Sequence, residues 1–179
     1  MNTIQKKWLI ILQGLFFALG GVSILLNRFD NVNISLLLVA SGLAGAYFLT
    51  SNKQINTIKI FKSMLIIEIL MSILSAIAFY IWGNDPHNFI LIFALFSIFF
   101  GMIPFFFLFG ILTSGAKLRF DMAKFRLIGG FISLIFGFYL IAVKHIDTTE
   151  TLKYIGIIMI VIGVSILFGF RLVQKIIDK

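Results

Sequence analysis

The residue of this chain best placed to do chemistry is a lone carboxylate in an apolar stretch, Glu68 in MLIIEILMSI, residues 64–73. At 100° per residue, Glu68, Ser72, Ser75 and Phe79 fall within about 40° of one line along a helix, so the carboxylate heads a small polar stripe. Glu68 follows Lys62 by six residues, or about 9 Å along a helix axis. Lipid would disfavour this stripe, and we expect it to face other helices.

Three roles for Glu68 are open, because an ionisable group inside an apolar segment is a candidate functional group. It could be a neutral acid that hydrogen-bonds between helices. It could take up and release a proton, as a pH sensor or in coupled transport. It could also extend to the lipid headgroups or pair with a basic loop residue. Gln13 is the other strong polar group in an apolar segment, and it would be a partner for Glu68 if their two helices touch.

Both histidines lie two residues from an aspartate in short polar turns. Asp85 and His87 belong to NDPHN, and His145 and Asp147 belong to KHIDTTE. Histidine changes its charge between about pH 5 and 8, so external acid would make these turns more basic. Solvated loop residues are the simpler interpretation. A metal ion would need more ligands in a fixed geometry than two short loops supply, and we predict no metal site.

Catalytic motifs are absent from the sequence, which contains no H-E-x-x-H, G-x-S-x-G or phosphate-binding loop. The chain also has no cysteine, which excludes disulfides and thiolate metal sites. We therefore predict a protein that is not an enzyme, with no catalytic residue and no cofactor.

The composition indicates that lipid is the solvent for these groups. Of 179 residues, 60% are hydrophobic and 12% are charged, against roughly 45–50% and about 25% in soluble domains. The segments do not alternate apolar and polar residues as barrel strands do. The sequence predicts an all-α membrane protein with six segments of bilayer-spanning length: residues 8–26, 34–50, 63–83, 89–113, 127–143 and 154–170.

Lysine and arginine lie mainly on one side of these segments. Twelve fall before the first segment, after the last, or in the second and fourth connections, and only Arg28, Lys144 and Lys153 fall on the other side. Cytoplasmic loops are enriched in basic residues, so we expect a cell-membrane protein with both termini in the cytoplasm. We interpret the net charge of +8 as this topology signal and as attraction to anionic lipids, with no nucleic-acid partner. The first segment is too long for a signal peptide and is expected to be retained.

The six segments form three consecutive helical hairpins, approximately residues 1–52, 53–116 and 117–179, of one transmembrane domain. Gly14 and Gly21 are seven residues apart, as are Gly130 and Gly137. Counting back 33 residues from Gly163 gives Gly130, and the same count from Gly101 gives Glu68, which would replace a glycine in the middle hairpin. Small residues let membrane helices approach closely, and the glycines predicted to do so are Gly14, Gly21, Gly42, Gly45, Gly101, Gly130, Gly137 and Gly163. Pro104 is expected to kink or loosen its helix.

The repeated pattern in KKWLIILQGLFFALGGVSILL and RLIGGFISLIFGFYLI, within three hairpins joined by short turns, resembles the HdeD-type acid-resistance membrane proteins. This resemblance implies a six-helix inner-membrane protein linked to stress and low pH, without a catalytic motif. We therefore favour a stress or acid-tolerance component. The alternatives are a small transporter or solute-binding subunit that uses Glu68, and an immunity or accessory protein that docks a partner through its helices. The expected partners are the lipid bilayer and either a second copy of the chain or another membrane protein.

Overall fold

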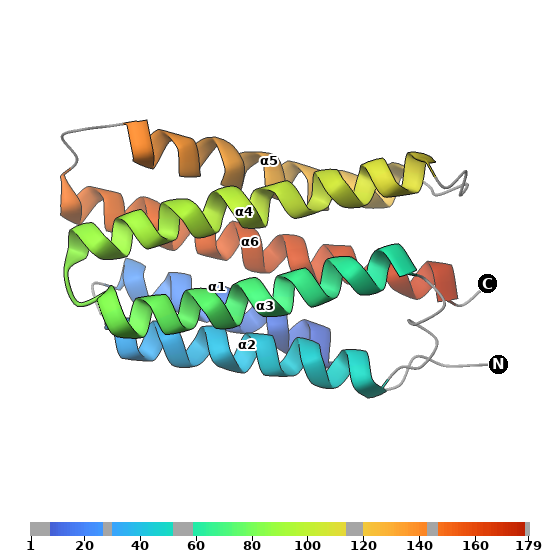
Figure 1. Ribbon diagram of the computed structural model, residues 1–179, viewed down its shortest axis with the longest axis horizontal. Coiled ribbons are helices and arrows are strands. Elements are labelled where there is room, and N and C mark those ends of the chain that lie inside the picture. Colours follow the sequence, from blue (N-terminus) through green and yellow to red (C-terminus); the bar gives the residue numbers. More distant parts are fainter. Residues whose placement is uncertain (1–7, 27–29, 52–58, 114–119, 143–146, 178–179) are drawn as a thin grey trace.

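The structure is a computed structural model that describes residues 8–26, 30–51, 59–113, 120–142 and 147–177 (Figure 1). These residues form an all-helical protein, without a strand in any of the five ranges. Six helices follow one another along the chain: α1 (Trp8–Leu25), α2 (Asn31–Ser51), α3 (Lys59–Trp82), α4 (Pro86–Thr113), α5 (Phe120–Ala142) and α6 (Thr148–Ile177).

The helices form a closed ring, in which each contacts its neighbours in the chain and α6 packs back onto α1. All six run along the long axis of the molecule, and α1 begins at the same end at which α6 finishes (Figure 1). We call this the terminal end, and the opposite end, where α3 turns into α4, the hairpin end. The predicted order of three hairpins thus gives one bundle in which the first and last helices are in contact.

The returning helices begin earlier than their apolar segments because an aspartate caps each of them. Asp30, Asp85 and Asp147 each stand immediately before a helix. In each case Oδ1 accepts the backbone N–H two residues further on, at 2.9, 3.1 and 2.8 Å respectively. Such N-caps satisfy backbone donors that have no partner within the helix. The apolar pattern alone therefore placed the start of α2, α4 and α6 three to six residues too late.

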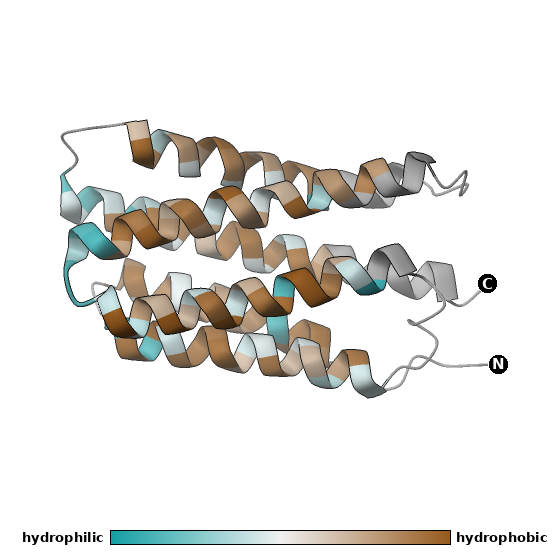
Figure 2. Ribbon diagram, viewed as in Figure 1, coloured by the Kyte–Doolittle hydropathy of each residue, from teal (hydrophilic) through white to brown (hydrophobic). Residues whose placement is uncertain are grey.

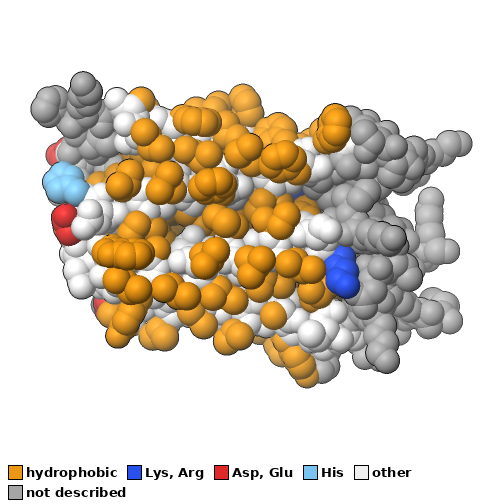
Figure 3. Space-filling view, in the orientation of Figure 1, with side chains coloured by type: hydrophobic (Ala, Val, Ile, Leu, Met, Phe, Trp, Pro, Cys, Tyr) orange, Lys and Arg blue, Asp and Glu red, His pale blue; other side chains and the backbone are white. Residues whose placement is uncertain are grey.

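The outer surface of the ring is apolar, as a bilayer requires. Five of the helices are long and apolar enough to cross a membrane, and α5 contributes a shorter apolar stretch, Arg126–Ala142. Hydrophobic side chains cover the face shown in Figure 3, while polar colours gather at the hairpin end in Figure 2. A soluble monomer rarely exposes so large an apolar surface. The fold is that of a helical multi-pass membrane protein.

Tryptophan and tyrosine side chains mark both ends of this apolar surface. They are all at least half exposed, and such side chains are enriched where a membrane meets water. Trp8 and Tyr47 lie toward the terminal end, and four lie toward the hairpin end: Tyr80, Trp82, Tyr139 and Tyr154.

Glycines bring helices from different hairpins into close contact. A Cβ added to Gly14 would lie 2.7 Å from the carbonyl oxygen of Gly163, which joins α1 to α6. A Cβ added to Gly101 would lie 2.6 Å from the carbonyl oxygen of Gly130, which joins α4 to α5. Real Cβ atoms do not approach a carbonyl oxygen this closely, so only glycine fits at these positions. The small-residue stripes pack inside the chain and do not form a free outer face.

The α2–α3 interface corrects the repeat alignment by one residue. The added Cβ of Gly42 would lie 3.5 Å from the carbonyl oxygen of Ile69. The added Cβ atoms of Gly163 and Gly101 would lie closer to the carbonyl oxygens of Gly14 and Gly130, at 2.5 and 2.6 Å. Ile69, rather than Glu68, therefore takes the glycine position in the middle hairpin. One residue is 100° of helix rotation, which turns the Glu68 carboxylate away from this interface.

Phenylalanine side chains fill the centre of the ring. Phe17 of α1 contacts Phe96 and Phe100 of α4, with ring centroids 5.9 and 5.7 Å apart, and all three are buried. This contact links two helices that are not neighbours in the ring. The helix α4 runs unbroken through Pro104, whose ring lies 2.8 Å from the position of an added Cβ on Gly130. The space that glycine leaves on α5 therefore accommodates the proline.

Candidate functional site

A buried ion pair joins Glu68 of α3 to Arg126 of α5. The guanidinium Nη2 contacts the carboxylate Oε1, and the side chains of Arg126 and Glu68 are 6% and 2% exposed. The helices that carry them are both ring neighbours of α4. Glu68 lies six residues after Lys62, and Arg126 lies six residues after the start of α5 at Phe120, so each is more than one helical turn inside its helix. The pair is therefore a polar connection inside the apolar bundle.

Arg126 is not the loop residue that the sequence indicated. The helix α5 begins at Phe120, six residues before Arg126, although the apolar segment begins only at Leu127. The predicted segment 127–143 therefore leaves out a buried basic residue that belongs to the same helix. Of the three roles considered for Glu68, pairing with a basic residue matches the structure, and that residue belongs to a helix. The available signal was spacing, because Arg126 falls four residues before Gly130 and so shares its buried face.

The aromatic centre supports the guanidinium from one side. The Cζ atom of Arg126 lies 5.7 Å from the centroid of the Phe100 ring, within the range of a cation–π interaction. Phe100 contacts Phe17, and Gln13 stands one turn before Phe17 on α1. The site is thus continuous from α3 and α5 through α4 to α1.

Several buried polar atoms of this site have no hydrogen-bond partner within the described part of the chain. They are Nε and Nη1 of Arg126 and both amide atoms of Gln13. The Gln13 side chain is fully buried, and its Oε1 lies 3.1 Å from where a Cβ on Gly45 would be. The bundle therefore places Gln13 against α2, and no hydrogen bond to Glu68 forms. Leaving a buried polar group unsatisfied costs about 1–3 kcal/mol, so these atoms are available to water or a ligand.

The serines on the predicted polar stripe are buried and make no hydrogen bond to the Glu68 carboxylate among the described contacts. Ser72 and Ser75 are both buried, as are Glu68 and Phe79 of the same stripe. The Ser72 hydroxyl donates to the backbone carbonyl of Glu68 at 2.8 Å, one turn back on the same helix. Between helices, the Ser133 hydroxyl donates to the backbone carbonyl of Ser97 at 3.0 Å. The Ser72 hydroxyl therefore does not bond to the Glu68 carboxylate, which pairs with Arg126 instead.

The aspartates near the histidines have local structural roles. Asp85 accepts the backbone N–H of His87, and Asp147 accepts those of Thr149 and Glu150. Both aspartates are N-caps of the helices that follow them. His145 lies outside the described residues. Within the described ranges no three histidine, aspartate or glutamate side chains cluster as metal ligands would.

Comparisons of this chain with models of protein families, with curated proteins and with solved structures give no match. Fold and site together define a multi-pass helical membrane protein whose interior contains the Glu68–Arg126 ion pair with polar neighbours.

Proposed function

We propose that this chain is a non-enzymatic component of the cytoplasmic membrane that supports tolerance of acid or a related stress, with both termini in the cytoplasm. The single observation that carries this proposal is the buried Glu68–Arg126 pair, which would act as a proton-responsive connection between two helices. The resemblance of the glycine pattern to HdeD-type proteins supports the same function. The excess of lysine and arginine on one side of the spanning segments supports the cytoplasmic position of both termini.

Protonation of Glu68 is the event through which acid would act. It removes the negative charge and leaves the Arg126 cation buried without its counterion. Removing one partner of a buried pair typically costs about 3–5 kcal/mol, and protonation of Glu68 within the closed bundle would carry a comparable penalty. Acid would therefore favour an arrangement in which α3 and α5 are no longer held together. A local change of charge that biases two packed states is the usual basis of a pH switch.

Survival of cells under external acid tests this function. Cells that lack the protein are compared with cells that express the wild type, Glu68→Gln or Arg126→Gln at equal membrane levels. Glu150→Gln is the matched control, because it makes the same chemical change in the exposed first turn of α6. We expect protection by the wild type and by Glu150→Gln, and loss of protection in both variants of the pair.

Other outcomes assign the site differently. Protection that survives both changes in the pair would make Glu68–Arg126 a purely structural tie. Protection lost only with Glu150→Gln would move proton sensing to the membrane surface. No protection by the wild type would refute the acid-tolerance function.

Transport is the second candidate, and the unpartnered buried atoms favour it. Arginine has five N–H donors, and in Arg126 only Nη2 engages Glu68 among the described residues. The free donors and the Gln13 amide would bind the oxygen atoms of a small polar solute or of water on a proton path. Proteoliposomes that contain the protein and a pH-sensitive dye would show proton flux, which Glu68→Gln would stop. Absence of flux above protein-free vesicles would exclude proton transport.

A further inference from the structure

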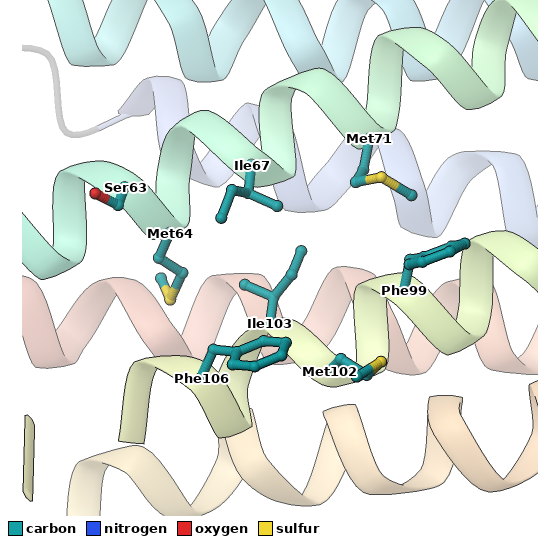
Figure 4. A pocket seen from close by; sticks show the side chains of 8 residues that line it. All are labelled: Ser63, Met64, Ile67, Met71, Phe99, Met102, Ile103 and Phe106. Atoms are coloured by element: carbon teal, nitrogen blue, oxygen red, sulfur yellow. The ribbon is translucent and has the colours of Figure 1, made fainter. Parts of the chain in front are cut away.

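An apolar groove lies between α3 and α4 in the terminal half of the bundle. Its volume is about 490 Å³, within the roughly 300–1,000 Å³ typical of ligand pockets. Figure 4 shows side chains from both helices directed into it. The groove is lined by one serine, two isoleucines, three methionines and two phenylalanines: Ser63, Ile67, Ile103, Met64, Met71, Met102, Phe99 and Phe106.

The groove exists because α3 and α4 lack the glycine contacts found at other interfaces. Gly101 of α4 faces Gly130 of α5, and Gly42 of α2 faces Ile69 and Ile73 of α3. The glycine contacts of α3 and α4 are therefore made with α2 and α5, and none of them lies between α3 and α4 among the described residues. Between α3 and α4 the facing side chains are long, and methionine is flexible enough to adapt to a guest.

The groove has the length and direction of an acyl chain in one leaflet. It extends from Ser63 to Met71 along α3, or about 12 Å at 1.5 Å per residue. One leaflet of a hydrocarbon core of about 30 Å is about 15 Å thick. Several lining residues are exposed on the apolar belt, among them Phe99 at 54% and Phe106 at 65%. The groove thus opens sideways into lipid.

A basic residue stands at the terminal end of this groove. Lys62 directly precedes the lining residue Ser63, and its side chain is partly exposed. Figure 3 shows a basic side chain where the hydrophobic surface meets the terminal end. A cation at this level complements the phosphate of a lipid headgroup, while the groove below it is lined by apolar side chains beyond Ser63.

We propose that the α3–α4 groove binds one acyl chain of an anionic phospholipid, whose phosphate lies at Lys62. This site is distinct from the ion pair and does not depend on the acid-tolerance function. The lipid completes the packing of the middle hairpin, since its chain fills the space between two helices whose side chains do not close it.

Native mass spectrometry of the full chain in mild detergent tests the proposal. The purified protein is exchanged into detergent with added phosphatidylglycerol or phosphatidylcholine, and bound lipid is counted. Met102→Trp fills the groove. Leu95→Trp is the matched control, because Leu95 lies two turns away on α4, is 45% exposed and does not line the groove. Lys62→Gln removes the headgroup contact without changing the groove, and Lys62→Arg restores the charge.

We expect one retained lipid on the wild type and on Leu95→Trp, and its loss from Met102→Trp. Lys62→Gln should reduce the preference for phosphatidylglycerol about fivefold, the equivalent of one lysine near an anionic surface, and Lys62→Arg should restore it. Equal retention by Met102→Trp and Leu95→Trp would overturn the groove as the binding site. An unchanged preference in Lys62→Gln would overturn the assignment of an anionic lipid. The mass spectrometry measures bound lipid and not cell survival. Failure of the lipid proposal can therefore be distinguished from failure of the proposed function.

Discussion

Two adjacent glycines of α1 provide a matched test of how the bundle is held together. A Cβ added to Gly21 would overlap the backbone carbonyl oxygen of Gly156 on α6 and would lie 2.8 Å from Cγ1 of Ile160. A Cβ added to Gly20 would meet only the end of a flexible side chain, Cε of Met159 at 2.9 Å. Gly21→Ala must therefore separate two helix backbones, whereas Gly20→Ala requires only a methionine to move.

The expected difference between the variants follows from these contacts. Both substitutions gain the same helix propensity, about 1 kcal/mol, so this gain cancels when the two are compared. Overpacking that displaces backbone costs about 1–3 kcal/mol, and only Gly21→Ala incurs it. In a chain of this size about 1 kcal/mol shifts the midpoint by roughly 2–4 °C. Gly21→Ala should therefore unfold roughly 2–12 °C below Gly20→Ala.

Thermal unfolding in detergent, followed by circular dichroism, measures this difference. Gly20→Ala is expected to unfold at or slightly above the wild-type midpoint. A Gly21→Ala variant as stable as Gly20→Ala would refute the close α1–α6 contact, and with it the closure of the ring.

Three further changes test the ion pair, the caps and the serine stripe. Glu68→Leu and Arg126→Leu should each lower the unfolding free energy by about 3–5 kcal/mol, and the double variant by less than either; additive losses in detergent unfolding would contradict the pair. Asp147→Ala should cost about 1 kcal/mol and Asp147→Asn much less, since the asparagine side-chain oxygen can still accept the Thr149 N–H; equal midpoints for the two would argue against capping. Ser72→Ala should leave acid survival unchanged, because its hydroxyl bonds to the backbone; lost protection would show that the serine acts on the carboxylate.

The local sequence pattern was sufficient to predict one helix face of the site. Helical spacing grouped Glu68 with Ser72 and Ser75, and the structure buries all three. Local pattern failed for Arg126, because the search for apolar segments ended at the first charge and so excluded the residue that satisfies Glu68. The two partners are 58 residues apart in the chain, and no property of either neighbourhood specifies the other.

The sequence by itself determined the solvent, the helical class and the order of the hairpins. Each depends on composition and on the length of single segments, because a helix in lipid satisfies its own backbone. Only the tertiary structure decided which helices meet. Lipid tails are as apolar as the helix surfaces, so burial from lipid does not favour one helix pair over another. Helix pairing depends instead on close contacts such as Gly14 with Gly163. Those contacts bring α6 onto α1, turn Glu68 toward α5 and leave the groove between α3 and α4.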